Sequence, residues 1–423
     1  MQGQVALNVQ QSIRPGECID TFYAGKENSL KQCHATVNDN RFFQGLQAPQ
    51  SGSSSTVTFN PNEGLSEVIV CLQLPAPATG VGLAAPLGWG YNLLRRIGYR
   101  YGSSQLYYIT GAQNLLQTVA LCEDSGKKQQ ILFLGGQALT TPADWADPAK
   151  RTAYVYLRLP HSSPALSGGA LPFPSDVLTA PIQLQIDLAD FTQVISAVTG
   201  ADTVPSTLSL AQVNFTQVTM QDAGDLVARR FDMSKHALTI PLVEGWTQEE
   251  VQFRFGSGSD GTFSLSLTGC KAGDLKKLRV WFTKVSDTNG PVKNSNIWYP
   301  PAQIRFAING LIYLDSIAGS YLLTDVLRRR TPPTITASLL ASTAPPAFTA
   351  SPIASTFVEI DLAQPYTIGN SQEVALLHGV PVMNSVLNLT GTMPSVDTDY
   401  VCHVEYVLNC SWMASRGSAE FVF

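Results

Sequence analysis

One stretch of this chain occurs twice, first at 97–119 and again, without a gap, at 304–326. Each copy opens with apolar residues at alternate positions, which is the period of a strand with one buried face. Each then has a pair suited to a tight turn, Gly102-Ser103 or Asn309-Gly310, because such a turn needs residues that tolerate a positive φ. A second apolar run and a helix-like segment with paired leucines follow. The repeat predicts two copies of one domain.

A second, shorter repeat supports this prediction. The segment YVYLRL at 154–159 matches FVEIDL at 357–362, again with apolar residues at alternate positions. Strands of unrelated proteins resemble one another, so either match alone could arise by chance. Two matches in the same order and with nearly equal spacing favour an internal duplication.

The length favours two domains, and the composition favours domains with much of their surface buried in contacts with other subunits. A chain of 423 residues is longer than one hydrophobic core usually supports. Only 14% of the residues are charged, against about 25% in a typical soluble protein. Interface cores are depleted in charge, so this composition favours burial of much of the surface against other subunits. The alternative is a β-rich protein whose polar residues are mainly Ser, Thr, Gln and Asn.

The charge of the chain argues against wrapping nucleic acid. Its 27 basic and 32 acidic residues give a net charge of -5, whereas a nucleic-acid-binding domain usually carries a basic patch. The longest basic run, Arg328-Arg329-Arg330, precedes Thr331-Pro332-Pro333, which is typical of cations at the C-terminus of a helix. Contact with a genome or an acidic partner is the alternative for this run. We expect no specific nucleic-acid binding.

The sequence carries no visible signal for secretion or membrane insertion. Its first residues, MQGQVALNVQQ, lack the basic region and apolar core of a signal peptide. No apolar run reaches the roughly 18 residues of a membrane span, so none is expected. The cysteines are odd in number and scattered, which is typical of free thiols in a reducing compartment. They are Cys18, Cys33, Cys71, Cys122, Cys270, Cys402 and Cys410.

Strand signals are dense along the chain and helix signals are few. The motif Thr141-Pro142-Ala143-Asp144 has an N-cap, a proline at the first helical position and an acid at N3, so it predicts a short helix. A helix-like segment at 320–329 precedes a proline-containing loop at 331–352. Besides the two repeated hairpins, strands are predicted near 19–23 and at 56–59, 67–74, 131–134, 153–159, 182–188, 207–220, 237–243, 251–255, 262–267, 278–282, 356–362, 385–389 and 400–411.

Each half therefore has roughly eight short strands and one or two short helices, with turn signals about every 8 to 15 residues. This spacing favours a sandwich or a barrel over βαβ units. An eight-stranded antiparallel sandwich with long excursions between some strands is a jelly roll, so the predicted fold class is all-β with two tandem jelly rolls. A pair of immunoglobulin-like domains is the alternative, but the Cys…Trp…Cys spacing of that fold is missing.

The domain limits are placed by polarity. The segment 222–236 is the most polar interval between the two repeats. The expected domains are an N-terminal arm with a first strand at 1–54, a first jelly roll at 55–228 and a second jelly roll at 229–423.

Two segments of the first half resemble a known family. They are RIGYRYGSSQLYYITGAQNLL at 96–116 and YVYLRLPHSSPALSGGALPFPSDVLTAPIQLQIDL at 154–188. Both are similar to segments of the double jelly-roll major capsid proteins of the adenovirus hexon and tectivirus lineage. The duplication and the chain length agree with this resemblance, which covers about 56–411 through degenerate patterns. The loops are short for a hexon, which implies a compact capsomer without tall towers.

The resemblance implies a structural role in an icosahedral DNA virus. A major capsid protein of this family is expected to form a homotrimer, which makes a pseudo-hexameric capsomer of the virion. Its expected partners are neighbouring capsomers and penton and minor capsid proteins, and assembly is expected in the host nucleus or cytoplasm. One alternative is a secreted carbohydrate-binding or carbohydrate-active two-domain β-protein, against which the missing signal peptide and the odd thiols count. A minor capsid protein of the penton or spike is the other, against which the duplication counts.

No constellation of catalytic residues is visible in the sequence. It has no GxxxxGK[ST] phosphate loop, no GxSxG nucleophile elbow and no HExxH zinc motif. Adjacent residues on a strand point to opposite faces, so neither Cys33-His34 nor Cys402-His403 is expected to hold one metal. We predict no catalytic residue, no cofactor, no metal and no enzymatic activity.

Two carboxylates share one strand face. Glu359 and Asp361 lie two positions apart in the second repeat and align with Tyr156 and Arg158 of the first half. Paired acids in glycoside hydrolysis face each other across a cleft, and a catalytic pair has no reason to lie in a repeat. We interpret these acids as solvated face residues.

Three aromatic residues stand out from the general pattern. Most aromatic residues alternate within predicted strands, which indicates core packing. Trp89 lies in a Gly-Trp-Gly segment and Trp298-Tyr299 lies among prolines, and both precede the repeated strand. We predict these three residues as subunit contacts, because aromatic residues often anchor interfaces.

Overall fold

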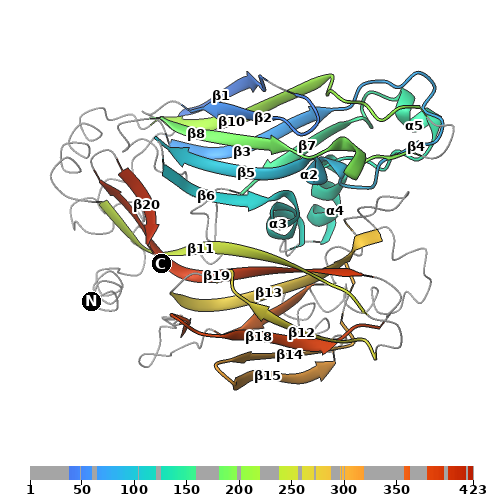
Figure 1. Ribbon diagram of the computed structural model, residues 1–423. Coiled ribbons are helices and arrows are strands. Elements are labelled where there is room, and N and C mark those ends of the chain that lie inside the picture. The colour runs from blue at the N-terminus through green and yellow to red at the C-terminus, as the bar shows by residue number, and fades with distance from the viewer. Residues whose placement is uncertain are drawn as a thin grey trace.

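The chain folds into two β-sandwiches that lie one above the other in Figure 1, the first in blue to green and the second in yellow to red. The computed structural model describes residues 38–47, 49–59, 64–102, 104–120, 125–158, 181–197, 202–219, 238–255, 260–270, 273–286, 296, 298–299, 301–318, 357–362, 379–394, 399–415 and 418–422. The predicted strand at 19–23, helix at 320–329 and boundary segment at 222–236 lie outside these residues, so the domain limits stay a prediction.

The first sandwich has two four-stranded antiparallel sheets, with the strand orders β1-β10-β3-β7 and β2-β8-β5-β6. A further two-stranded sheet pairs β4 (Leu83–Ala84) with β9 (Ser196–Ala197). The strands of the sandwich are β1 (Asn38–Gly45), β2 (Ser54–Thr58), β3 (Gly64–Gln73), β5 (Leu94–Tyr101), β6 (Ser104–Thr110), β7 (Thr152–Leu157), β8 (Ile182–Leu188) and β10 (Leu210–Thr219).

The second sandwich also has two antiparallel sheets, with the orders β11-β19-β13-β16 and β12-β18-β14-β15. The first of these is extended by β17 (Val380–Pro381) on β13 and by β20 (Ser418–Val422) on β19. The other strands are β11 (Leu238–Phe253), β12 (Thr262–Leu267), β13 (Asp274–Lys284), β14 (Gln303–Ile308), β15 (Leu311–Ala318), β16 (Val358–Asp361), β18 (Leu387–Thr392) and β19 (Tyr400–Ser415).

The two sandwiches share one topology. When the eight strands of each sandwich are numbered along the chain, one sheet has the order 1-8-3-6 and the other 2-7-4-5 in both sandwiches. The strand order of both sheets is that of a jelly roll, in which sequential strands alternate between the two layers except for the hairpin of the fourth and fifth strands. The predicted fold class of two tandem antiparallel jelly rolls is confirmed.

The repeated sequence forms the same hairpin in each sandwich, β5–β6 in the first and β14–β15 in the second. The turns use left-handed residues, with a φ of 57° at Gly102, 50° at Asn309 and 81° at Gly310. The two ladders share one register shift, after Tyr99 and after Phe306, and the β14–β15 ladder has a further shift between Ile304 and Phe306. A shared irregularity is stronger evidence for duplication than shared regular strands, because a bulge is a local choice of the sequence.

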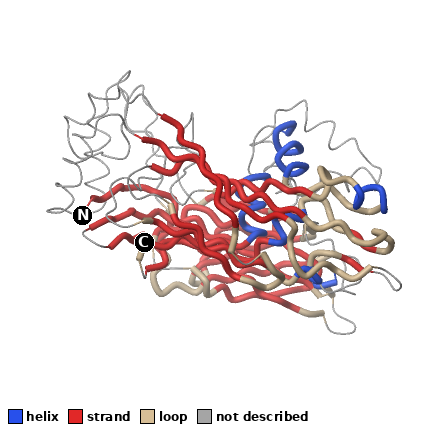
Figure 2. The backbone as a smooth tube through the Cα atoms, turned by 90° about the horizontal axis from the view of Figure 1, so that it is seen from above, coloured by secondary structure: helices blue, strands red, loops and turns tan. Residues whose placement is uncertain are grey.

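The helices lie mainly between strands of the first sandwich, and Figure 2 shows them toward one end of the strands. The predicted helix at Thr141 is confirmed: α5 starts with a capping box and a proline in its first turn. The prediction of a strand at 131–134 (ILFL) is wrong, since this run ends helix α4. Four apolar residues alone do not distinguish a helix from a strand. The helical segments are α2 (Trp89–Leu93), α3 (Gly111–Leu115), the π-helical turn η2 (Leu116–Ala120), α4 (Ser125–Leu134), α5 (Pro142–Ala146) and the 3-10 turn η4 (Phe191–Gln193).

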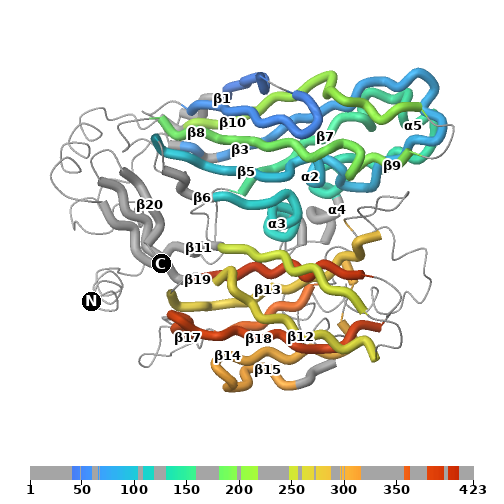
Figure 3. The backbone as a smooth tube through the Cα atoms, viewed as in Figure 1, coloured from blue at the N-terminus to red at the C-terminus, as the bar shows by residue number. Residues whose placement is uncertain are grey.

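Each sandwich buries the apolar faces of its two sheets against each other. On β8, Ile182, Leu184 and Ile186 are fully buried and alternate with partly exposed glutamines and an aspartate. The same alternation on β12 buries Phe263, Leu265 and Leu267. The tube in Figure 3 shows the resulting layers, with helix α3 on the side of the first sandwich that faces β11 of the second.

Gly310→Val should lower the free energy of unfolding of the second sandwich by about 1–3 kcal/mol. The φ of 81° at Gly310 is closed to β-branched residues, and a Cβ there would meet no atom within 4 Å, so backbone strain is the cause. Chemical denaturation measures the change. Gly310→Asn is the matched control and should cost less, because Asn tolerates the left-handed region. An unfolding curve of the Val variant that matches the unmodified protein would contradict the turn.

Candidate inter-domain interface

The two central strands of the sheet β11-β19-β13-β16, β19 and β13, are buried on both faces over much of their described length. On β13, Leu278, Val280 and Phe282 belong to the core of the second sandwich. Arg279 and Trp281 point to the opposite face, yet they are only 3% and 1% exposed. Side chains alternate along a strand, so a strand that is buried throughout needs protein on each side. The second layer is the first sandwich, which lies against this sheet in Figure 1.

The apolar part of the contact continues the core of the first sandwich. Four residues of the second sandwich, none more than 2% exposed, belong to the same apolar cluster as the first core; they are Trp281, Trp298, Phe357 and Val407. The rings of Trp281 and Trp298 pack with their centroids 5.5 Å apart. Burying one large apolar side chain stabilises a fold by about 1.5–3 kcal/mol, so these residues bind the sandwiches together strongly.

A charged array lies beside the two tryptophans. Gln117 of η2 donates a hydrogen bond from Nε2 to Oε1 of Glu405 on β19, at 2.8 Å. Arg279 lies between two carboxylates, with Nη1 3.5 Å from Glu405 Oε1 and Nε 2.8 Å from Glu359 Oε2. Buried charges are tolerated only when they are paired and hydrogen-bonded, and each charge here has a partner. The array therefore runs from η2 of the first sandwich across β19 and β13 to β16 of the second.

Lys277 extends the array toward its exposed edge. Its Nζ lies 3.7 Å from both Glu359 Oε1 and Asp361 Oδ2. The interpretation of Glu359 as a solvated residue is wrong, because its side chain is only 8% exposed and pairs with Arg279. The reason is that the face it shares with Asp361 is covered by the first sandwich, which the pattern of one strand does not reveal. Asp361, at 32%, is the more exposed of the two.

Two further hydrogen bonds join the sandwiches. Thr110 caps α3 by accepting a hydrogen bond from the Gln113 N–H, and its hydroxyl donates to Oε1 of Gln248 on β11, at 3.0 Å. Asn296 of the second sandwich donates from Nδ2 to the carbonyl oxygen of Leu87, at 2.7 Å. One threonine thus both starts a helix and joins the two sandwiches.

The position of Gln117 is set by hydrogen bonds to β7. Nδ2 of Asn114 donates to the carbonyl oxygen of Tyr156 at 2.8 Å, and Oδ1 of Asn114 accepts from the Arg158 N–H at 3.3 Å. The Arg158 guanidinium donates to the carbonyl oxygen of Gln117 at 3.4 Å. The segment α3–η2 is therefore held against the first sandwich, and it presents Gln117 to the second.

His403 and Cys402 point to opposite faces of β19, as predicted. Cys402 is fully buried in the second core, where burial raises its pKa well above the ordinary value. His403 stacks on Trp281 with the ring centroids 5.2 Å apart. Its ring nitrogens pair with Thr283 Oγ1 at 2.9 Å and with Glu250 Oε1 at 3.1 Å. The two side chains therefore cannot hold one metal, and Cys33-His34 lies outside the described residues.

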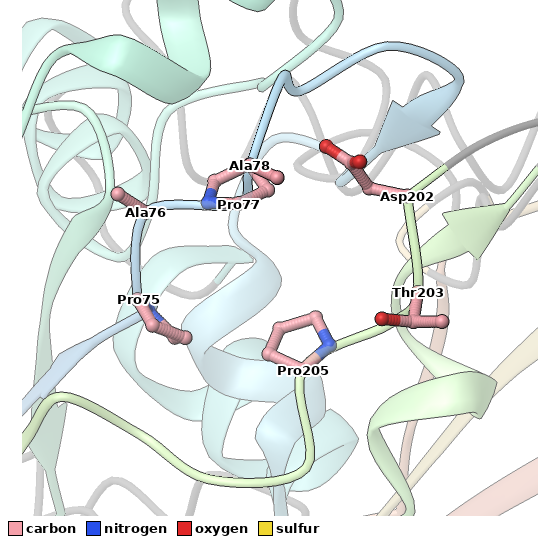
Figure 4. Close-up of a pocket in the computed structure, with 7 residues that line it drawn as sticks. All are labelled: Pro75, Ala76, Pro77, Ala78, Asp202, Thr203 and Pro205. Carbon is pink, nitrogen blue, oxygen red and sulfur yellow. The ribbon is translucent and has the colours of Figure 1, made fainter.

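A small pocket of about 270 Å³ lies in the first sandwich, shown in Figure 4. Its lining is mostly proline and alanine: Pro75, Ala76, Pro77, Ala78, Asp202, Thr203 and Pro205. The Asp202 carboxylate accepts hydrogen bonds from the backbone N–H groups of Thr79 and Gly80, which hold its pKa below the usual range. This carboxylate fixes a loop, and the lining offers no nucleophile with a neighbouring base.

Within the described residues, no three His, Cys, Asp or Glu side chains are grouped so that they could bind a metal ion. None of the described helices has the length and apolarity that crossing a lipid bilayer requires. The described cysteines, Cys71, Cys270 and Cys402, are free thiols.

The three predicted contact residues lie in different surroundings. Trp89 begins α2 and is fully buried in the first core, and Trp298 is 2% exposed beside Trp281. Both side chains are therefore enclosed within the chain, where Trp298 joins the two sandwiches. Tyr299 is partly exposed, with Lys284 Nζ 4.4 Å above its ring. Contact of Tyr299 with another subunit stays a prediction.

The sequence reasoning did not select Arg279, Glu405 or Gln117. One signal was present: the run LRVWF at 278–282 has an arginine inside an apolar stretch without clear alternation. Near-continuous apolar strands are typical of sheets buried on both faces. The run therefore pointed to a covered sheet, but not to what covers it.

Comparison with known proteins agrees with this architecture. No family profile and no curated protein matches the sequence. A chain of the PBCV-1 virus capsid has a similar structure, with a TM-score of 0.61 and 10% identity over 92% of this chain and 97% of its own. The Faustovirus major capsid protein has a TM-score of 0.56 and 8% identity, over 96% of each chain. A chain of the Sputnik virophage has a TM-score of 0.50 and 11% identity, over 92% of this chain and 89% of its own.

The fold is the double jelly roll of viral major capsid proteins. The match covers both jelly rolls, because it extends over nearly all of each chain. At this level of identity the likeness concerns the backbone fold alone.

Arg279→Met should lower the free energy of unfolding by about 3–5 kcal/mol, because it leaves Glu405 and Glu359 buried without their positive partner. The matched control is Arg305→Met. Arg305 pairs with Asp315 at 3.4 Å, but the two side chains are 43% and 70% exposed, so the expected loss is about 0–1 kcal/mol. Denaturant unfolding of both variants measures the difference. Equal losses would show that the buried array has no special role.

Proposed function

We propose that this chain is the major capsid protein of an icosahedral virus and that three copies form one capsomer. The single observation that carries the proposal is the pair of jelly rolls with the same strand order, joined by a buried interface. The likeness to capsid proteins along nearly the whole chain supports it.

The geometry of the chain favours three copies. Each chain contributes two similar sandwiches, so a trimer has six sandwich units and a nearly hexagonal outline that tiles a shell. The hydrogen bond from Gln117 to Glu405 and the packing of the two tryptophans against the first core hold the sandwiches of one chain together, which a repeating tile requires. The proposed partners are neighbouring capsomers and penton and minor capsid proteins, in a virion assembled in the host nucleus or cytoplasm.

The proposed mechanism is burial of surface, without turnover of a substrate. Charged residues are 14% of the chain, which agrees with extensive contact between subunits. A carbohydrate-active protein would need a cleft with facing carboxylates, and Glu359 is instead buried in an ion pair. A penton or spike protein more often carries one jelly roll, whereas this chain carries two.

Native mass spectrometry of the full chain should show mainly a complex of three 45.6 kDa chains. The complex should persist at high salt, because salt does not screen apolar contacts. Measurement at low and high ionic strength provides the internal control. A stable monomer at micromolar concentration, without larger species, would exclude the capsomer.

Purified protein should contain no stoichiometric metal. Elemental analysis of the full chain after extensive dialysis against a metal-free buffer measures this, and a zinc-binding protein of known content calibrates it. One equivalent of zinc per chain would overturn the prediction and would point to ligands that include residues beyond the described part.

A further inference from the structure

The strand β12 forms an open edge of the second sandwich. It is the first strand in the order β12-β18-β14-β15, and no described strand pairs with its other side. Met393 donates its backbone N–H to the carbonyl oxygen of Gly261, so these residues are a hydrogen-bonded pair at the end of the β12–β18 ladder. Because such pairs alternate in an antiparallel ladder, the backbone N–H and C=O groups of Ser264 and Ser266 point away from β18. They offer a template for one more strand.

This edge lacks the features that usually close an edge strand. Natural edges carry charged side chains, a proline or a bulge, which prevent pairing with another segment. The sequence of β12, TFSLSL, has no charge and no proline, and its ladder with β18 has no register shift. The outward side chains of β12 and β18 are all uncharged; they are Thr262, Ser264, Ser266, Asn388, Thr390 and Thr392. An uncharged extended segment therefore fits this edge.

The strand β2 is the equivalent edge of the first sandwich. It is the first strand in the order β2-β8-β5-β6. Across the ladders, Thr56 of β2 lies in line with Gly98 of the repeated hairpin, and Ser264 of β12 lies in line with Arg305. Gly98 and Arg305 align in the repeat. Thr56 and Ser264 are therefore equivalent residues, and β2 provides an internal comparison for β12.

The edge of β2 is open in the same way but has a charge beside it. Phe59 donates its N–H to the carbonyl oxygen of Ile182, so the same alternation turns the N–H groups of Thr56 and Thr58 to the open side. On the outward face, the Asp187 carboxylate of β8 accepts a hydrogen bond from β2. An uncharged segment therefore fits β12 better than β2.

The inward residues favour β12 as well. Phe263, Leu265 and Leu267 are 6%, 6% and 3% exposed, whereas Val57 on β2 is fully buried. The second core is thus not completely covered along β12. A further strand with apolar residues on its inward side would remove this remaining apolar surface from water.

A segment of this chain has the matching pattern. Residues 4–10, QVALNVQ, precede the described residues and contain no charged side chain. Val5, Leu7 and Val9 occupy alternate positions, which is the period of a strand with one apolar face. On an antiparallel strand beside β12, these apolar side chains would adjoin the inward residues of β12. The amide side chains between them would adjoin the serine hydroxyls.

The chain before β1 is long enough for this contact. Residues 11–37 separate the segment from β1. A linker of about 27 residues spans at most about 90 Å, whereas a folded chain of about 420 residues has a radius of gyration of about 22 Å. The segment can therefore reach β12 of its own chain. The covalent link raises its effective concentration there to the order of millimolar, which favours its own chain over another copy.

We propose that the segment 4–10 pairs with the open edge of β12 in the same chain, as a further antiparallel strand. The central register places Leu7 opposite Leu265 and Asn8 opposite Ser264, so that apolar side chains point inward and amides outward. Figure 1 shows β1 in one sandwich and β12 in the other, so this pairing adds a link between the sandwiches besides their buried interface. The inference goes beyond the proposed function and does not depend on the number of chains in a capsomer.

Hydrogen exchange of single amides tests the pairing. In the unmodified chain, the amides of Ser264 and Ser266 should exchange at least about 10-fold more slowly than those of Thr56 and Thr58 at the equivalent edge. Deletion of residues 2–11 should remove this protection and leave the exchange at β2 unchanged. Equally fast exchange at both edges of the unmodified chain would contradict the pairing, and so would protection that survives the deletion.

Substitutions in the segment test which of its faces points inward. Leu7→Lys should release the amides of Ser264 and Ser266, because it places a charge beside the second core. The matched control is Asn8→Lys at the next residue, which should keep the protection because this side chain points to solvent. Neither residue belongs to a core of the described part, and circular dichroism of both variants checks that the fold is kept. Equal exchange in the two variants would overturn the proposed register.

Cross-linking tests whether the segment and the edge belong to one chain. A short bismaleimide should join Asn8→Cys to Ser264→Cys when both changes are in the same chain, and mass spectrometry identifies the linked peptides. The unmodified chain, with its seven cysteines, measures the background. Chains with Asn8→Cys, co-expressed with chains with Ser264→Cys, should give no mixed product. A mixed product would overturn the contact within one chain, and the absence of any link would overturn the pairing itself.

The outcomes for this inference and for the proposed function are separate. A monomer with protected β12 amides and a link within one chain would contradict the trimer and support the pairing. A trimer with fast exchange at β12 and no link would support the capsomer and overturn the pairing.

Discussion

The contact between the two jelly rolls is built on a sheet face where one arginine is buried between two carboxylates. Arg279 is 3% exposed and pairs with Glu405 and Glu359, while Gln117 reaches Glu405 from the other sandwich. Apolar surfaces such as those around Trp281 are tolerant of small shifts, whereas a shift of the first sandwich would remove the Gln117 donor from the buried Glu405 carboxylate. The tryptophans therefore supply adhesion, and we infer that the charged array sets the register of one sandwich on the other.

Much of the fold follows from the sequence, because the duplication and the alternation of apolar residues are local patterns. The predicted strands at 182–188 and 262–267 coincide with β8 and β12, and the cap at Thr141 starts α5. The run at 131–134 was assigned to the wrong structure because four apolar residues fit a helix as well as a strand. β1 was not placed, since its sequence NDNRFFQG has few strand signals and is held by pairing with β10.

The interface was beyond prediction because it depends on distant parts of the chain. Gln117 and Glu405 are 288 positions apart, and no local pattern links them. The duplication even misled the interpretation of Glu359, since its place in the repeat indicated a solvated face, whereas in the second half that face lies against the first sandwich. Equivalent positions have diverged where their surroundings differ, as with Ile69 and Arg279, and have remained alike where both lie in a core, as with Val70 and Val280.

The covalent link between the two jelly rolls has a kinetic and thermodynamic consequence. Two separate sandwiches would associate only above a threshold concentration, whereas two sandwiches on one polypeptide meet at an effective concentration on the order of millimolar. The contact between Trp281, Trp298 and the first core thus forms as part of folding and survives dilution. A newly made chain therefore contains the complete contact between its two jelly rolls before it meets a second chain.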